Sequence, residues 1–347
     1  MKTLRTAAVG AGRIGWQYHL PQTVEHDGFE LVAVVDPLAD RLAEAAREFD
    51  TKGYSDHQSM LSEQKPDLVV ICSPTPFHVE QAIAAFEAGC DVFCDKPVAP
   101  SLDEAERIFS TAEKHGRKFM AYQPHRTHTI CLALQDILSQ GLIGPVYMMR
   151  RGQSRWRRRN DWQAWKKNGG GMLNNYGPHA IDQLLYVTGS KATKVSCSLR
   201  KVASLGDADD VAKVSMETDN GIVIDIDINQ ASAWRTDTWD VFGQTGTAIY
   251  DRPTKTWNVR YFLPGELPEL SVQEGMAAEG RIYKVGEIDD WREKQFPISD
   301  YERTDFYQKC YEYFGLDAEP FVTVAQTREL MRVLDVCKRS ASEGGWG

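Results

Sequence analysis

The sequence reads TAAVGAGRIG over residues 6–15, where a short apolar run leads into the pattern GxGxxG. In this pattern Gly10 permits a tight turn, Gly12 lets the backbone approach a pyrophosphate, and Gly15 lets the next helix pack closely on the strand. Free N–H groups at the start of that helix favour the negative charge of a phosphate. Asp36 ends the next apolar run, about twenty residues on, where a ribose-binding carboxylate is expected. The stretch therefore predicts a dinucleotide-binding strand, turn and helix.

Apolar runs alternate with helical patterns through the first third of the chain. Strands are predicted at residues 6–9, 31–35, 67–71, 91–94 and 118–122, and helices up to residue 22, at 37–49, at 78–88 and from 101. Runs without polar alternation are typical of strands buried on both faces. Repeated strand–helix units imply right-handed crossovers and a parallel sheet. We expect an α/β, Rossmann-type dinucleotide-binding domain over residues 1–124.

The pattern changes after about residue 127. Helices are predicted at 129–140, from 169 and at 324–342, strands at 146–150, 194–200, 211–218, 222–229 and 239–242, and an irregular stretch at 253–297. Residues 222–228, IVIDIDI, end in the apolar/acidic alternation of an antiparallel sheet with one wet face. We expect an α+β domain with a mostly antiparallel open sheet over residues 125–347, whose last helix packs back on the first domain.

Composition and charge exclude several classes of protein. The 347 residues carry 40 basic and 49 acidic side chains, a formal charge of −9, whereas nucleic-acid binding requires a basic footprint. No apolar run reaches the length of about 18 residues that spans a membrane, and the charged N-terminus does not fit a secretory signal. Seven scattered cysteines and eight histidines show no metal-binding spacing. We expect a cytoplasmic protein with reduced thiols, no metal, and neither nucleic-acid nor membrane partners.

Several motifs together resemble the Gfo/Idh/MocA oxidoreductases. They are GAGRIG at 10–15, SPT at 73–75 followed by His78, CDKP at 94–97, GGG at 169–171 followed by GPH at 177–179, and PFVT at 320–323. The resemblance covers nearly the whole chain. It implies a nicotinamide cofactor, a sugar, inositol or sugar-derivative substrate, and a homodimer or homotetramer formed through the C-terminal sheet.

The glycine pattern and the resemblance together assign a set of cofactor-binding residues. They are Gly10, Gly12, Arg13, Ile14, Gly15, Asp36, Ser73, Pro74, Thr75, His78, Asp95, Lys96 and Gln123. The carboxylate of Asp36 repels a 2′-phosphate, and Pro37 and Leu38 provide no arginine to hold one. NAD(H) is therefore expected in preference to NADP(H).

The resemblance also assigns two catalytic residues. In the family, the lysine of a Glu-Lys-Pro motif lies beside nicotinamide and substrate, which implies this place for Lys96, with Asp95 in place of the glutamate. An ammonium group there favours a developing alkoxide. His179 matches the family histidine that accepts a proton in oxidation and donates one in reduction. Imidazole suits this role because its unperturbed pKa lies near working pH.

One position departs from the family pattern. Many members have an aspartate four residues before the histidine, where this chain has Asn175. On a helix, Asn175 and His179 share a face, so the amide can hold the ring by a hydrogen bond but cannot stabilise an imidazolium. His179 then acts as a weaker base, the proton leaves by another route, or activity is weak or lost. Asp182, three residues on, either supplies the missing carboxylate or is structural.

Further substrate contacts are expected from Arg126, Trp162 and Asn174, with a helix cap as the alternative for Asn174. Residues 155–165, RWRRRNDWQAW, form an unusual Arg- and Trp-rich loop. Its indoles can pack on a sugar ring and its guanidinium groups can pair with an anion. The same composition fits a single-strand nucleic-acid surface, or a solvated loop whose tryptophans lie at a domain or subunit contact.

Three functions are compatible with these residues. The first is NAD(H)-dependent hydride transfer between nicotinamide and a hydroxyl or keto carbon of a sugar, inositol or derivative. The second is a lyase or hydrolase that recycles its nicotinamide through transient oxidation of a sugar. The third is a sensor that binds dinucleotide and sugar without turnover. Retention of both Lys96 and His179 favours an enzyme.

Overall fold

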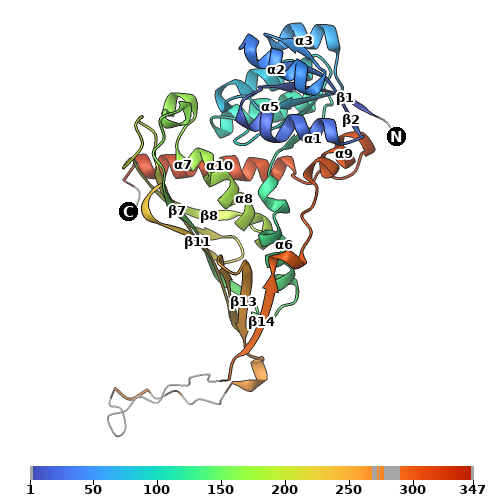
Figure 1. Cartoon of the computed structure of the whole chain (residues 1–347). Coiled ribbons are helices and arrows are strands. Elements are labelled where there is room, and N and C mark those ends of the chain that lie inside the picture. The colour runs from blue at the N-terminus through green and yellow to red at the C-terminus, as the bar shows by residue number, and fades with distance from the viewer. Residues whose placement is uncertain (1–2, 268–271, 273, 277–289, 345–347) are drawn as a thin grey trace.

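The computed structural model describes residues 3–267, 272, 274–276 and 290–344. Two β-sheets organise them (Figure 1). The first, coloured blue to cyan, lies among helices at one end of the molecule, and the second extends away from it. Among the described residues, no helix combines the length and apolarity needed to cross a bilayer.

The first sheet is parallel throughout, with strand order β3-β2-β1-β4-β5-β6. Its strands are β1 Leu4–Val9, β2 Phe29–Val35, β3 Lys52–Tyr54, β4 Leu68–Ile71, β5 Asp91–Cys94 and β6 Phe119–Ala121. The connecting helices are η1 Gly15–His19, α1 Leu20–Glu25, α2 Ala39–Phe49, α3 His57–Gln64, η2 Thr75–Phe77, α4 His78–Glu87 and α5 Leu102–Lys114. This strand order is that of dinucleotide-binding folds, and the predicted Rossmann class is confirmed.

The predicted cofactor residues follow the carboxyl ends of these strands. Gly10 follows β1, Asp36 follows β2, Ser73 lies two residues after β4, and Lys96 lies two residues after β5. Parallel strands place these ends at one edge of the sheet, where open α/β sheets bind their ligands.

The second sheet has the strand order β14-β13-β12-β11-β7-β10-β9-β8. Its strands are β7 Val146–Trp156, β8 Ala192–Arg200, β9 Val211–Thr218, β10 Val223–Asn229, β11 Ala231–Gly243, β12 Gly246–Asp251, β13 Thr256–Tyr261 and β14 Arg292–Pro297. All neighbours are antiparallel except β7 and β10, so the prediction of a mostly antiparallel sheet is confirmed. The helices of this half are η3 Pro124–Thr127, α6 Thr129–Ser139, η4 Trp162–Ala164, η5 Lys166–Asn168, α7 Met172–Asn175, α8 Gly177–Thr188, η6 Pro264–Glu266 and η8 Ile298–Asp300.

Four parts of this sheet differ from the sequence-based prediction, and one of them, β12 Gly246–Asp251, was not predicted at all. Strands β7 and β11 run well beyond the predicted 146–150 and 239–242, because their polar extensions pair with each other. The stretch 253–297, predicted as irregular, contains β13 and β14. Four of the six residues of β14 are exposed, so the strand lacks the apolar alternation that would reveal it. Residues 268–271, 273 and 277–289 of that stretch lie outside the described residues.

The last two helices, α9 Phe306–Leu316 and α10 Val324–Ser342, connect the two halves. Tyr307 of α9 lies in the core of the first domain, with its hydroxyl 2.8 Å from Nδ1 of His19. Helix α10 crosses between the two sheets (Figure 1). It packs against β8 and α5, and Oδ2 of Asp335 accepts a 2.7 Å hydrogen bond from the backbone of Leu102.

Candidate functional site

Neighbouring backbone atoms require glycine at two positions of the turn after β1. Gly10 has a φ of +108°, and a Cβ there would lie 2.7 Å from the backbone nitrogen of Ser73. A Cβ on Gly15 would lie 2.0 Å from the carbonyl oxygen of Gly10. A Cβ on Gly12 meets no atom closer than Arg41, at 4.0 Å. Gly10 and Gly15 thus shape the turn, whereas Gly12 faces space that a ligand can approach.

Asp36 is fixed at the edge of this turn. It is 2% exposed and accepts hydrogen bonds from the backbone N–H groups of Ala11, at 2.9 Å, and Leu38, at 3.0 Å. Nη1 of Arg41 lies 3.3 Å from Oδ2 of Asp36. Reasoning from the sequence considered only the two residues after Asp36 and missed this arginine, which the first turn of α2 brings back to the carboxylate.

Gln123, just after β6, supplies an unpaired polar group at the same edge. It is 1% exposed, and neither its amide nitrogen nor its amide oxygen has a hydrogen-bond partner among the described residues. A buried amide without partners is costly unless a ligand or water completes it. The open approach at Gly12, the carboxylate of Asp36 and this amide together fit a dinucleotide. Arg13 is exposed beside Gly12, and Ile14 caps the short π-helix η1.

Lys96 connects the two halves of the site. The turn that carries it includes a cis peptide bond between Lys96 and Pro97. Its Nζ atom donates a 2.7 Å hydrogen bond to the backbone carbonyl of Asn175, at the end of α7. Burial lowers the pKa of Lys96, the positive charges of Arg13 and Arg159 lower it further, and the carboxylate of Asp95 opposes them. The amine therefore lies in a tight, partly desolvated position.

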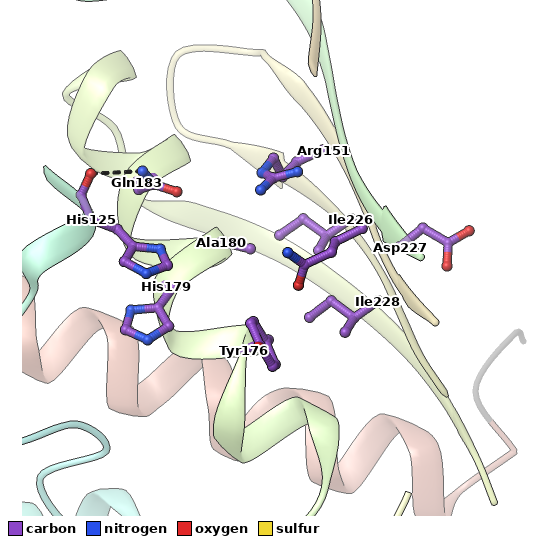
Figure 2. A pocket seen from close by; sticks show the side chains of 10 residues that line it. His125, Arg151, Tyr176, His179, Ala180, Gln183, Ile226, Asp227 and Ile228 are labelled. Carbon is purple, nitrogen blue, oxygen red and sulfur yellow. Dashed lines mark hydrogen bonds between the residues drawn. The ribbon is translucent and has the colours of Figure 1, made fainter. Parts of the chain in front are cut away.

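His179, near the start of α8, lies against a second histidine. Its ring stacks on that of His125 in η3, with centroids 3.7 Å apart and planes 12° from parallel (Figure 2). Nδ1 of His179 is buried and has no hydrogen-bond partner among the described residues. Burial lowers the pKa of His179 well below its ordinary value, and His125, Lys96 and His128 add to the effect. His179 is therefore neutral at pH 7 and able to accept a proton.

His125 is a residue of the site that the sequence-based assignment missed. Burial also lowers its pKa, as do the neighbouring charges of His128, Lys96, Arg151 and Arg303. The ring of His125 in turn helps to lower the pKa of His179, because two stacked imidazoles in a buried place disfavour simultaneous protonation. The only local signal was its position, three residues after the predicted strand 118–122 and next to Arg126.

A cavity between α8, β7 and β10 begins at these two rings. It is lined by His125, Arg151, Gln153, Tyr176, His179, Ala180, Gln183, Ile226, Asp227 and Ile228. Figure 2 shows the side chain of Asp227 directed away from it. Nε of Arg151 and Oε1 of Gln153 are buried and have no hydrogen-bond partner among the described residues. These donors and acceptors match the hydroxyl groups of a polyol, each of which both donates and accepts.

Two models of one protein family match the chain. Residues 4–123 match the "Oxidoreductase family, NAD-binding Rossmann fold", and residues 131–249 match the "GFO/IDH/MocA C-terminal domain". The chain belongs to the Gfo/Idh/MocA oxidoreductase family. The resemblance inferred from the motifs is thereby confirmed.

Curated relatives in this family include sugar and inositol dehydrogenases. The D-glucoside 3-dehydrogenase of Escherichia coli is 36% identical over 55% of this chain and 56% of its own length. An inositol 2-dehydrogenase of Klebsiella pneumoniae is 28% identical over 73% of this chain and 75% of its own. The match to the first of these spans little more than half of that relative.

Solved structures of similar proteins cover the whole chain. An NAD-binding protein from Listeria innocua matches with a TM-score of 0.85 and 25% identity, over 99% of this chain and 96% of that one. The WlbA dehydrogenase from Bordetella pertussis, solved with NADH and UDP-GlcNAcA, matches with a TM-score of 0.78 and 21% identity, over 99% and 98%. The second likeness shows the shared Gfo/Idh/MocA fold alone.

The other predicted cofactor residues of the Gfo/Idh/MocA site lie after β4 and β5. Ser73 donates from its hydroxyl to Gln81, Pro74 precedes η2, and Thr75 is buried at the start of η2. His78 is 1% exposed, and its two ring nitrogens face the backbone carbonyls of Ser73 and Pro97. Both ring nitrogens thus face main-chain carbonyls, and the cofactor-binding role of His78 stays a prediction.

The asparagines before His179 do not support its ring. The amide nitrogen of Asn175 lies 3.4 Å from Oε1 of Gln163, and that of Asn174 lies 3.2 Å from the carbonyl of Gly170. Helix α7 ends at Asn175 and α8 begins at Gly177, so the expected shared face is interrupted. Neither amide bonds to His179 among the described residues, and the role of Asn175 beside the ring stays a prediction.

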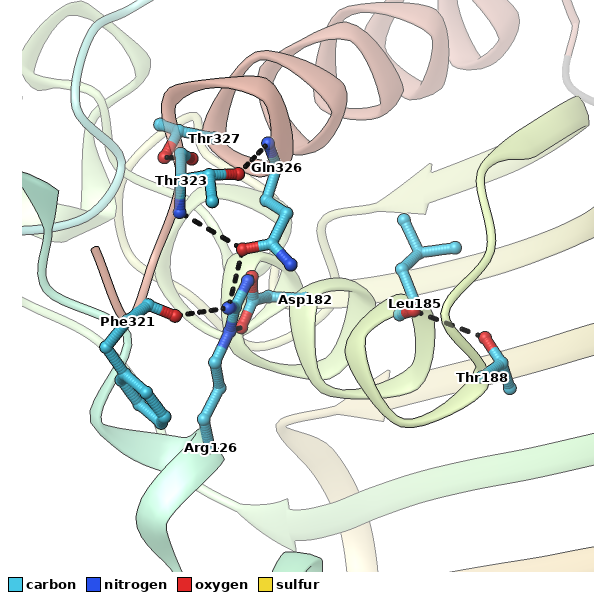
Figure 3. A network of polar contacts seen from close by, with 8 residues as sticks. All are labelled: Arg126, Asp182, Leu185, Thr188, Phe321, Thr323, Gln326 and Thr327. Atoms are coloured by element: carbon cyan, nitrogen blue, oxygen red, sulfur yellow. Dashed lines mark hydrogen bonds and ion pairs between the residues drawn. The ribbon is translucent and has the colours of Figure 1, made fainter. Parts of the chain in front are cut away.

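Arg126 is engaged inside the protein rather than with the cavity (Figure 3). It is 1% exposed, and its Nε and Nη2 donate to the two carboxylate oxygens of Asp182 at 2.8 and 2.6 Å. Its Nη1 donates to Phe321 and Gln326, at the start of α10. The substrate contact expected of Arg126 stays a prediction, and Asp182 is paired with Arg126 rather than with His179.

The Arg- and Trp-rich segment is partly strand and partly a loop against the first domain. Residues 155 and 156 end β7, and Trp162 begins η4 and is 44% exposed. Trp162 does not line the cavity next to His179. A Cβ on Gly169 would lie 3.5 Å from Thr75, so this loop reaches the cofactor side of the first domain. Within the described part of the chain, no cluster of His, Cys, Asp or Glu could hold a metal ion.

Proposed function

We propose that the protein is an NAD(H)-dependent oxidoreductase that interconverts a hydroxyl and a keto group on a neutral sugar, inositol or related polyol. The observation that carries this proposal is the contact between Nζ of Lys96 and the carbonyl of Asn175. It joins the nucleotide-binding edge of the first sheet to the segment that leads into His179. Sugar and inositol dehydrogenases among the relatives support the same reaction class.

The residues that would hold the cofactor are those of the glycine turn, Asp36 and Gln123. Bound NAD supplies a hydride acceptor, and NADH supplies the donor for the reverse reaction. We infer a preference for NAD(H), because the buried carboxylate of Asp36 opposes a 2′-phosphate. Arg41 offsets part of that charge and limits the preference.

Lys96 and His179 have separate roles when the substrate hydroxyl loses its proton. The ammonium group of Lys96 stabilises negative charge on the substrate oxygen, and its lowered pKa brings it closer to the pKa range of catalysis. His179 is held neutral by burial and accepts the proton during oxidation through a ring nitrogen. In reduction it returns that proton to the alkoxide.

A neutral substrate is inferred from the charges of the cavity. Among the described residues that line it, the arginine or lysine is Arg151, which is paired with Asp237 and stacks over Trp239. A substrate carboxylate would therefore face an arginine whose charge is already balanced. The polar atoms of Gln153 and His179 that have no partner among the described residues suit uncharged hydroxyl groups instead.

The test is a panel of inositols, hexoses, glucosides, uronates and 3-keto sugars, with NADH absorbance as the readout. We expect net NADH formation with a neutral polyol and a kcat/KM at least about tenfold lower for the matching uronate, as one lost favourable contact predicts. Conversion without net absorbance change would favour the recycling lyase or hydrolase. Binding without turnover would favour the sensor.

We also propose that the protein is a cytoplasmic homodimer or homotetramer formed through the second sheet. All seven cysteines are free and buried, which suits a reducing compartment. Helices α8 and α10 cover one face of the sheet (Figure 1), and the opposite face carries the exposed Val223 and Ile249. Light scattering coupled to size exclusion measures the subunit number directly, and a monomer would contradict the proposal.

A further inference from the structure

His78 is a buried histidine whose ring lies between two segments of the site. It begins α4, and its Nε2 atom is 2.7 Å from the carbonyl oxygen of Ser73. Its Nδ1 atom is 3.0 Å from the carbonyl oxygen of Pro97 and 3.5 Å from Sγ of Cys94. The ring therefore spans from the end of β4 to the turn that follows β5.

The two carbonyls belong to segments with different tasks. Ser73 forms the wall of the glycine turn, since a Cβ on Gly10 would lie 2.7 Å from its nitrogen. Pro97 directly follows Lys96, whose amine reaches Asn175 in the other half of the protein. Both segments are loops outside the sheet, so the β-ladder does not fix their relative position.

We propose that His78 is a positioning residue, which holds the turn carrying Lys96 at a fixed distance from the nucleotide-binding wall at Ser73. It touches neither substrate nor cofactor, and acts through the backbone of its neighbours. This inference rests on the role proposed for Lys96. A positioning role explains why this buried place holds a histidine. A leucine would fill a similar volume but could not contact the two carbonyls.

The charge state of the ring sets how many of the two contacts are hydrogen bonds. A neutral imidazole has one N–H and satisfies one carbonyl, and the protonated ring satisfies both. Burial lowers the pKa of His78, and the carbonyls of Ser73 and Pro97 and the charge of Asp95 oppose this. The Nε2 contact is the shorter of the two, at 2.7 Å against 3.0 Å for Nδ1.

The position of the turn has a measurable consequence at Lys96. The pKa of Lys96 is lowered mainly by burial, with Arg13 and Arg159 acting in the same direction and Asp95 against. If His78 no longer held the turn, water would reach Nζ and the pKa would rise toward its ordinary value. Misplacement of a positioning group by about 1 Å can lower a rate about 100-fold.

The experiment compares His78→Leu, His78→Gln and His78→Asn in the full chain. The first readout is the pH dependence of acetic anhydride labelling at Lys96, measured by peptide mass spectrometry without cofactor. We expect the labelling midpoint of His78→Leu to move to higher pH by about one unit. Gln, whose amide reaches toward the Nε2 position, restores most of the wild-type profile. Asn, which reaches only toward the Nδ1 position, restores less.

The second readout separates cofactor binding from turnover. We expect kcat of His78→Leu to fall about 10- to 100-fold while the Kd of NAD, from calorimetry, changes less than about threefold. His19→Gln is the matched control, because His19 is a buried histidine of the same domain whose side chain bonds to Tyr307 among the described residues. It should lower stability without moving the Lys96 labelling profile.

Three results would overturn the proposal. One is a wild-type labelling profile in a folded His78→Leu protein, and another is a loss of NAD affinity as large as the loss of kcat. If Leu prevents folding, the Gln and Asn variants decide the question, and profiles for both that match wild type would contradict the proposal. Because labelling needs no substrate, a failed substrate search would refute the proposed function and leave the test of His78 intact.

Discussion

The Nζ atom of Lys96 donates its 2.7 Å hydrogen bond to the main chain of Asn175, not to its side chain. The first domain thus contacts the second through a backbone carbonyl oxygen, an atom that every residue type has. The contact would be the same with the aspartate that many Gfo/Idh/MocA proteins carry at this position. The substitution therefore leaves the Lys96 contact in place and removes one negative charge from position 175, four residues before His179.

Replacing Lys96 by alanine should abolish most turnover and spare cofactor binding. Loss of one group that stabilises developing negative charge costs about 100- to 1,000-fold in kcat. The Kd of NAD should stay within about threefold, since the glycine turn and Asp36 are untouched. Lys52→Ala, which removes an exposed lysine paired with Glu63, is the control. Unchanged kcat in Lys96→Ala would refute the role of the lysine.

Replacing Asn175 by aspartate should make His179 more basic. A carboxylate within a few ångströms of an imidazole raises its pKa by about one unit or more. Since His179 must be neutral to accept a proton, the acidic limb of the kcat/KM profile for oxidation should move to higher pH. The measurement is the pH dependence of NADH formation, with Asn258→Asp on β13 as the control. An unmoved limb would show that residue 175 does not influence His179.

The buried His19 should make the protein less stable in acid. Burial lowers its pKa from 6.5 to about 4. The unfolded chain then binds a proton that the folded protein refuses, so stability is full above pH 6.5 and falls as pH drops toward 4. The shift corresponds to about 3 kcal/mol. Urea unfolding across this range should give a shallower pH dependence, by about one proton, for His19→Gln.

Replacing Arg126 by alanine should destabilise the protein without a direct effect on substrate recognition. It leaves Asp182, which is 4% exposed, as an unpaired buried charge, a change that costs about 3–5 kcal/mol. The double variant Arg126→Met with Asp182→Leu should recover much of this loss, because neither charge is then left alone. Denaturant unfolding measures both. A rise in substrate KM with unchanged stability would instead restore the role as a substrate contact.

Removing the carboxylate of Asp36 should relax the choice of cofactor. In Asp36→Ser, Arg41 loses its partner and can pair with a 2′-phosphate. The ratio of kcat/KM for NADP to that for NAD should rise at least about tenfold, and Arg41→Ala in the same background should reverse the gain. If the ratio stays constant in both variants, these two residues do not set the preference.

The nucleotide half of the fold could be predicted because its information is local. Gly10, Gly15 and Asp36 occupy places that only their residue types fit, and their spacing shows it. Strand β3 and helix α3 were missed, since a strand of three residues and a short polar helix carry little periodicity. The long polar strands β7 and β11 were cut short because they are stabilised by pairing with each other.

The site was only partly predictable because its remaining contacts are nonlocal. The motifs located Lys96 and His179, but only the folded chain brings His125 face to face with His179. The sequence could not show that Arg126 would form a buried ion pair with Asp182, 56 residues away. Nor could it show that both ring nitrogens of His78 face main-chain carbonyls.

Helix α9 has a consequence for how the protein is made. Tyr307 and Phe306 complete the aromatic core around His19, Phe93 and Tyr122 in the nucleotide-binding half. When the first 124 residues have emerged from the ribosome, the core of the nucleotide-binding half therefore still lacks the side chains of α9. That half reaches its final packing only after residue 316 has emerged, so its maturation during translation waits on the synthesis of the other half.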